Sequence, residues 1–247
     1  MPNGDPFRYI VGAGTHVGLV RSENEDNVAV HPSDALWAVA DGMGGHANGR
    51  WAAEQVVDEV LRARLSGSLP ADCDAIAGTL AHANAKILAA SRTTGATIGS
   101  TVVALRIAGG RHACLWAGDS RIYRLRAGRL RQLTRDHSHV EQLVEAGVIT
   151  PEQAQNHPMA HVITRAVGVA PDLSLDVVED AIVAGDAFLL CSDGLNKCLA
   201  DGEIAAIIDT HPPREACDAL LAASLERGAP DNVSVVVVRC EVAHPGA

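Results

Sequence analysis

The stretch IYRLRAGRLRQL, residues 122–133, alternates apolar and charged side chains on both sides of Ala127-Gly128. Alternation with a period of two is typical of a β-strand with one buried face, and a short loop containing glycine joins antiparallel strands tightly. The stretch therefore predicts a β-hairpin, and it favours antiparallel pairing for the neighbouring strands.

Several other apolar runs have strand length and are bounded by glycine, aspartate or asparagine. Because they are short and rich in β-branched or aliphatic residues, they predict buried strands rather than helices. These runs are ALWAVA (35–40), TVVALRI (101–107), HACLWA (112–117), AFLLC (187–191) and VSVVVV (233–238).

The helical segments lie in separate blocks. Residues 51–65 and 75–90 each place apolar side chains on one stripe, which predicts two adjoining helices. Residues 150–153, TPEQ, are typical of a capped helix start, and Gly147 can close the helix before it. A last helix is predicted over 214–227. Strands and helices in separate blocks favour one α+β domain with stacked sheets and helices outside.

Composition narrows the class of protein. The 247 residues are 47% hydrophobic and 20% charged, which is enough for one large core without disulfide or zinc staples. A net charge of −10 disfavours a nucleic-acid or anionic-membrane partner. The six cysteines are scattered and predict reduced, mostly buried thiols. No signal segment or long apolar run is present, so we expect a soluble cytoplasmic protein.

Four aspartates stand at the ends of apolar runs, each next to a small or turn-forming residue: Asp41, Asp119, Asp193 and Asp231. Stacked sheets can bring strand ends to one rim, where crowded carboxylates repel one another unless cations neutralise them. A set of oxygen ligands alone favours Mg²⁺ or Mn²⁺, and two such ions can activate a shared water against a phosphoryl group. The alternative is that each Asp belongs to an ordinary turn.

Three further aspartates serve as an internal comparison. Asp180 and Asp186 flank the strand before Asp193, and Asp201 stands where a helix could start. We interpret them as solvated turn residues and a helix N-cap, not as catalytic groups.

The segment RSENEDN, residues 21–27, precedes a strand predicted to begin near Val28. In isolation it is a charged loop. Arg21 is suited to a phosphate because a guanidinium offers paired donors, and Glu25 and Asp26 could orient metal-bound water.

Taken in order, eight segments resemble the bacterial branch of the metal-dependent protein phosphatases, the type 2C or PPM family. The resemblance covers about residues 10–240 and implies a single domain over 1–247, with a flap over about 135–165. The implied fold is a four-layer α-β-β-α sandwich of two antiparallel sheets flanked by helices. The segments are RSENEDN (21–27), DGMGGH (41–46), GSTVV (99–103), AGDSRIYRLR (117–126), LTRDHS (133–138), ITRAVG (163–168), SDGL (192–195) and DNVSVVVV (231–238).

The resemblance also implies roles for the aspartates. Asp41 resembles the carboxylate that bridges both metals, and Gly42 resembles the residue that lends a backbone carbonyl to one of them. Asp193 and Asp231 resemble ligands of the other ion. Asp119 corresponds to a ligand of a third, weaker ion that is described in bacterial members.

The phosphate-binding arginine of the family corresponds to Arg21, and the acidic pair that holds metal-bound waters corresponds to Glu25 and Asp26. One departure affects the general acid: Met43 stands where eukaryotic members commonly have histidine. His46 is one candidate for the acid, because an imidazole titrates near neutral pH, and a metal-bound water is the other.

The predicted flap contains His137, His139, His157 and His161. Their spacing fits no common zinc pattern, so we interpret them as surface helix residues. In this family the flap lies beside the catalytic channel, and we expect it to select the substrate.

The function that the resemblance implies is hydrolysis of protein phosphoserine and phosphothreonine by a metal-bridging hydroxide. It implies two Mn²⁺ or Mg²⁺ ions, with a third left open, phosphoprotein substrates and an opposing Ser/Thr kinase. Two alternatives stay open here: a catalytically silent partner-switch protein of the same fold, and a small-molecule phosphate hydrolase.

Overall fold

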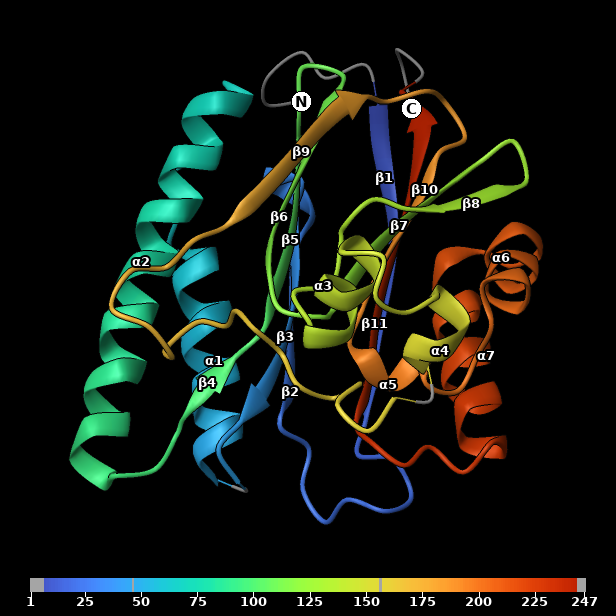
Figure 1. Ribbon diagram of the computed structural model, residues 1–247. Coiled ribbons are helices and arrows are strands. Elements are labelled where there is room, and N and C mark those ends of the chain that lie inside the picture. Colours follow the sequence, from blue (N-terminus) through green and yellow to red (C-terminus); the bar gives the residue numbers. More distant parts are fainter. Residues whose placement is uncertain (1–6, 46, 156, 244–247) are drawn as a thin grey trace.

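Two β-sheets lie face to face, with helices on their outer sides, in the computed structural model of the chain (Figure 1). The structure describes residues 7–45, 47–155 and 157–243. This arrangement is the α-β-β-α sandwich that the family resemblance implies, and strand pairing in both sheets is antiparallel.

The first sheet has the strand order β1-β11-β10-β7-β8, and the second has the order β2-β3-β5-β6-β9. The strands of the first sheet are β1 (Phe7–His16), β7 (Arg121–Arg126), β8 (Arg129–Gln132), β10 (Ala187–Cys191) and β11 (Val233–Val242). Those of the second are β2 (Asp26–His31), β3 (Leu36–Met43), β5 (Val102–Ala108), β6 (Arg111–Ala117) and β9 (Asp176–Ala181), and β4 (Gly99–Ser100) pairs with β3.

The predicted hairpin is confirmed by β7 and β8. Ala127 and Gly128 have φ angles of 50° and 73°, and two successive residues in the left-handed region make a turn that matches the twist of paired strands. The predicted apolar runs are also strands, although β3 continues through Asp41 and Gly42 to Met43.

Three strands were not predicted from the sequence, namely β1, β9 and the two-residue β4, and the first two were missed for different reasons. β1 is rich in glycine, and it pairs along its whole length with β11. At Gly12 a Cβ would lie 2.2 Å from the carbonyl oxygen of Pro213, so this strand lacks a side chain where a helix packs against it. β9 is a mostly exposed edge strand without an apolar run.

Helices α1 (Ala47–Leu61) and α2 (Leu69–Thr94) cover the second sheet, and α6 (Asp201–Thr210) and α7 (Pro213–Glu226) cover the first (Figure 1). Short helices are α3 (His139–Glu145), α4 (Pro151–Gln155) and α5 (Asp193–Asn196), with a 3-10 turn at Pro32–Asp34. The prediction for α1 began and ended about four residues late, and for α6 only a helix start at Asp201 was predicted, without its extent.

The capping prediction at Thr150 is confirmed. The Gln153 amide donates to Thr150 Oγ1 at 3.3 Å, and the Thr150 amide donates to Gln153 Oε1 at 2.8 Å. At the start of α6 the prediction needs correction: Asp201 is the first helical residue, and the N-cap is Ala200.

The core between the sheets is built around Trp37 and Phe188. The outer face of each sheet packs against its helices through mostly aliphatic side chains. All six cysteines are free, and all except Cys198 are buried, as the sequence predicts. Within the described ranges, no helix combines the length and apolarity needed to cross a bilayer.

Asp186 is not the solvated turn residue that we predicted. It is 1% exposed, and its carboxylate receives two 2.7 Å hydrogen bonds from Arg126. Asp180 is 54% exposed, as expected, and it pairs with Arg124 at 2.7 Å. Asp186 immediately precedes β10, whereas Asp193 follows that strand, so the two aspartates lie at opposite ends of it.

Candidate functional site

Five aspartates gather where strands of both sheets begin or end. Asp26 begins β2 and stands directly opposite Asp41, near the end of β3, in the antiparallel register. Asp119 precedes β7, Asp193 follows β10 and Asp231 precedes β11. Since β10 pairs antiparallel with both β7 and β11, these three carboxylates share one end of the first sheet. We call the five residues the acidic rim.

The backbone around Asp41 is held by Thr101, which lies between β4 and β5. The Asp41 amide donates to Thr101 Oγ1 at 3.0 Å, and the Thr101 amide donates to the Asp41 carbonyl at 2.8 Å. Thr101 Oγ1 also lies 2.7 Å from Ser120 Oγ, beside Asp119. Two rim carboxylates are thus positioned by one buried hydroxyl network.

Gly42 stands where three segments meet. Its amide donates to the Glu25 carbonyl at 3.1 Å, and a Cβ on Gly42 would lie 2.0 Å from the carbonyl oxygen of Gly49 in α1. A larger residue would push α1 away from β3. Gly194 is equally confined, because its Cβ would lie 1.9 Å from the Asn232 carbonyl oxygen.

The carboxylates of the rim are shielded from water, and their negative charges repel one another. Burial, followed by the charges of Asp193 in the rim and of Asp136 outside it, raises the pKa of Asp119 to about 7. Burial also raises the pKa of Asp26 to about 7, against hydrogen bonds from Ser192 and Ser234. The pKa of Asp41 is raised well above its ordinary value by burial and by the charges of all four other members.

Two buried oxygens of the rim, Asp26 Oδ1 and Asp193 Oδ1, have no hydrogen-bond partner among the described residues. Buried carboxylate oxygens without donors are costly unless a cation satisfies them. Burial raises the pKa of Asp193 as well, which Lys197 partly opposes. The donor chemistry of the rim therefore fits a hard divalent cation.

Two basic side chains already contact the rim. Lys197 Nζ lies 2.5 Å from Asp193 Oδ2 and 3.0 Å from Asp231 Oδ2. Arg21 donates to both oxygens of Asp231, at 2.9 and 3.2 Å. The pKa of Asp231 is lowered overall, because these bonds outweigh its burial. Sequence reasoning identified Arg21 but missed Lys197, whose signal is its i,i+4 spacing from Asp193.

Across residues 7–45, 47–155 and 157–243, no three Asp, Glu, His or Cys side chains are already set as a metal-ligand group. Lys197 and Arg21 instead hold oxygens of Asp193 and Asp231. The aspartates are brought together at one rim, but their carboxylates must turn from these basic groups to share an ion.

Asn232 organises the charged loop beside the rim, and sequence reasoning missed it. Its Oδ1 accepts from the Glu25 amide at 2.8 Å, and its Nδ2 donates to the carbonyls of Val17 and Glu23 at 2.9 and 3.0 Å. These bonds keep the loop that carries Arg21 against the start of β11. The signal in the sequence is the polar Asp-Asn pair before the apolar run.

Glu25 and Asp26 differ in their surroundings. Asp26 is buried and receives a 2.7 Å hydrogen bond from Ser192 Oγ, whereas Glu25 is half-buried and faces α1. A Cβ on Gly49 would lie 1.9 Å from Glu25 Oε2. Met43 ends β3, and His46, the candidate acid, lies outside the described residues.

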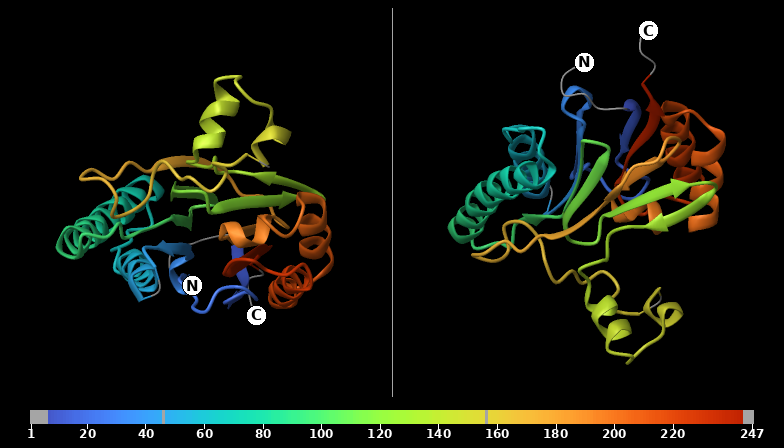
Figure 2. Two further views of the ribbon diagram at one scale, coloured as in Figure 1. Left: turned by 60° about the horizontal axis from the view of Figure 1, so that its bottom comes forward. Right: turned by 90° about the horizontal axis from the view of Figure 1, so that it is seen from above.

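The segment over 135–165 projects from the body of the molecule with α3 and α4 (Figure 2). Its two ends are tied together, since the Thr164 amide donates to the His137 carbonyl at 2.6 Å and the His139 amide donates to the Val162 carbonyl at 2.8 Å. The His137 amide also donates to the Gly118 carbonyl at 2.8 Å. The base of the segment therefore adjoins Asp119.

His137 is not a surface helix residue, contrary to our prediction. It is 8% exposed, stacks on Trp116 with ring centroids 5.9 Å apart, and its Nε2 lies 3.2 Å from Asp176 Oδ2. His137 thus anchors the base of the projecting segment. The described structure holds no three-residue zinc-type group that includes the other flap histidines.

Comparison with known proteins agrees with this architecture. The family model for protein phosphatase 2C matches residues 14–232. The serine/threonine protein phosphatase PstP of Mycobacterium tuberculosis is 38% identical over 232 residues, which cover 89% of this chain and 43% of the relative. The chain thus spans less than half the length of that protein.

Solved structures give the same result. PppA of Pseudomonas aeruginosa, described as a key regulatory component of T6SS, superposes with a TM-score of 0.88 at 42% identity, covering 94% of this chain and 98% of that one. The catalytic domain of PstP in complex with 2 manganese ions superposes with a TM-score of 0.85 at 34% identity, covering 95% and 99%. The chain belongs to the protein phosphatase 2C family.

Proposed function

We propose that this chain is a metal-dependent phosphatase that hydrolyses phosphoserine and phosphothreonine on proteins. The observation that carries the proposal is the acidic rim, where burial and mutual repulsion raise the pKa of Asp41 well above its ordinary value. A protein that only binds a partner has no physical need to hold so much like charge in one place. The matched relatives are named as serine/threonine protein phosphatases, which supports the same activity.

Asp41, Asp193 and Asp231 would hold two divalent ions together with the Gly42 carbonyl, and Asp119 would belong to a third site. Mn²⁺ is the first choice, because a PstP catalytic domain binds two manganese ions, and Mg²⁺ is chemically equivalent for these oxygens. When bound, such ions activate water and stabilise the charge that develops on a phosphoryl group. Glu25 and Asp26 would orient water beside them.

Arg21 would hold the phosphate. Its side chain is 57% exposed and its guanidinium presents paired donors to Asp231, the geometry that also matches two phosphate oxygens. As Asp231 turns toward an ion, the guanidinium becomes available to the substrate. The proton for the leaving oxygen would come from His46 or from water, since Met43 offers none.

The chain would form one phosphatase domain over 1–247, with its core over about 10–240 and with 135–165 as a flap that selects the substrate. The substrates would be phosphoproteins in the cytoplasm, opposite a Ser/Thr kinase. The flap base adjoins Asp119 through His137 and Gly118, which supports a role at the mouth of the site.

Release of phosphate from an aryl phosphate and from a phosphothreonine peptide tests the proposal. The expected result is turnover of both with Mn²⁺ and loss of both when EDTA is added. Activity that survives EDTA, or no activity with Mn²⁺, would contradict it.

A further inference from the structure

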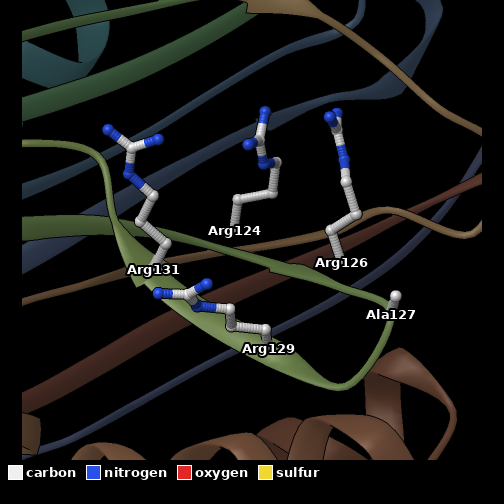
Figure 3. A pocket seen from close by; sticks show the side chains of 5 residues that line it. All are labelled: Arg124, Arg126, Ala127, Arg129 and Arg131. Carbon is white, nitrogen blue, oxygen red and sulfur yellow. The ribbon is translucent and has the colours of Figure 1, made fainter.

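The hairpin of β7 and β8 carries arginines in directly opposed pairs. Arg124 pairs in register with Arg131, and Arg126 pairs with Arg129. With Ala127 they line a cavity of about 490 Å³ (Figure 3). Like charges directly opposite one another destabilise a strand pair, so the arrangement carries an energetic cost.

Only half of this charge is compensated. Arg124 is paired with Asp180 and Arg126 with Asp186, each at 2.7 Å. Arg129 and Arg131 are exposed, and no ion pair joins either to another described residue. On a chain with a net charge of −10, this edge strand is a local positive surface.

The hairpin runs away from the rim. Asp119 lies five residues before Arg124, and strands rise about 3.3 Å per residue, so the Arg124–Arg131 pair stands roughly 16 Å along the chain from Asp119. An extended peptide covers at most about 3.4 Å per residue. A substrate segment would reach the arginines about five or more residues from its phosphorylated side chain.

We infer that Arg129 and Arg131 dock an acidic segment of the phosphoprotein substrate, at a distance from the site of hydrolysis. This deepens the proposed function and rests on it. Charge complementarity selects the occupant, since carboxylates match exposed guanidiniums and none of the described residues that line the cavity is acidic.

The test compares phosphothreonine peptides that carry three aspartates two or eight residues away from the phosphothreonine. With Arg129→Ala/Arg131→Ala we expect kcat/KM for the eight-residue spacing to fall at least fivefold in low salt, mainly through KM. The two-residue peptide and an aryl phosphate should be unaffected. The matched control is Arg64→Ala/Arg92→Ala, which removes two exposed arginines elsewhere.

An equal loss for both spacings, or no loss at all, would overturn the docking inference. A loss that also affects the aryl phosphate would do the same, because that substrate has no segment to dock. Absence of turnover in the wild type with Mn²⁺ would instead contradict the proposed function.

Discussion

Ser192 Oγ donates a 2.7 Å hydrogen bond to Asp26 Oδ2, and this bond joins the two sheets at the acidic rim. Ser192 follows β10 in the first sheet, whereas Asp26 begins β2 in the second. The same hydroxyl accepts from the Ser234 amide at 3.0 Å. The Asp26 carboxylate, whose other oxygen has no hydrogen-bond partner among the described residues, is therefore fixed between the two sheets. Holding that unsatisfied oxygen in a buried place lowers the stability of the metal-free protein.

The buried rim carboxylates predict an unusual dependence of stability on pH. The pKa of Asp26 and that of Asp119 are each raised to about 7, so the folded protein holds protons that the unfolded chain has already lost. Stability is then present at lower pH and is lost as pH rises through 7. We expect the unfolding free energy of EDTA-treated protein to fall between pH 6.5 and 8, by about 1 kcal/mol per group.

Urea unfolding at several pH values measures this fall. Asp26→Asn should flatten it, and Mn²⁺ should reverse it because a cation favours the charged carboxylates. A metal-free protein that becomes more stable from pH 6.5 to 8 would contradict the prediction.

Asp41→Asn should fold normally and lose activity. The variant keeps the backbone bonds to Thr101 but removes a charge that would contact both ions. We expect a loss of at least about 100-fold in kcat with Mn²⁺, the order found when a group that stabilises developing charge is removed. Asp201→Asn is the control, because Asp201 is exposed at the start of α6. Wild-type turnover by Asp41→Asn would refute the bridging role.

Lysine should not replace arginine at position 21 without loss of substrate binding. Arg21→Ala removes the two guanidinium N–H donors that contact Asp231. Arg21→Lys restores the positive charge but not this pair of donors. We expect KM for an aryl phosphate to rise about tenfold in Arg21→Ala, with Arg21→Lys recovering only part of the loss. Equal recovery by lysine would show that charge alone is needed.

Most of the strands, and four of the five rim aspartates, could be predicted because the local sequence pattern determines them. The Ala127-Gly128 turn requires left-handed backbone, and the apolar runs end at aspartates that a stacked sheet brings together. Hydrophobic periodicity, turn residues and charged residues at strand ends each depend only on residues a few positions apart in the sequence.

The missed features depend on partners far away in the chain. Asp186 resembles a turn residue until Arg126, sixty positions earlier, is placed beside it. His137 contacts Trp116 and Asp176, and Asn232 Nδ2 donates a hydrogen bond to the Val17 carbonyl. No local pattern in the sequence encodes such pairings, so burial of a single polar residue could not be predicted.

A buried ion pair beneath α2 should matter for stability but not for metal binding. Asp72 Oδ2 accepts from Arg106 Nε at 2.9 Å and Nη2 at 2.7 Å, and both side chains are almost fully buried. Arg106→Met would leave the carboxylate buried without its partner, which typically costs about 3–5 kcal/mol. Urea unfolding measures the loss, and Asp72→Leu/Arg106→Met should recover part of it. A loss below about 1 kcal/mol in Arg106→Met would contradict the role of the pair.

His112 should weaken the protein in acid. Its ring packs 4.8 Å from Phe188, is 1% exposed, and has no hydrogen-bond partner on either nitrogen among the described residues. Burial, aided by the charge of Arg124 and opposed by Asp180 and Asp186, lowers its pKa to about 4.

Between about pH 6.5 and 4 this histidine is therefore protonated in the unfolded chain but neutral in the folded chain. Stability is lost as pH falls through that window, by about 2–3 kcal/mol. His112→Leu removes both the titration and the unpaired nitrogens, so its melting temperature should exceed that of the wild type most clearly near pH 5. His82→Gln, at an exposed position of α2, is the control. If His112→Leu and the wild type lose stability equally between pH 6.5 and 5, the acid sensitivity arises elsewhere in the fold.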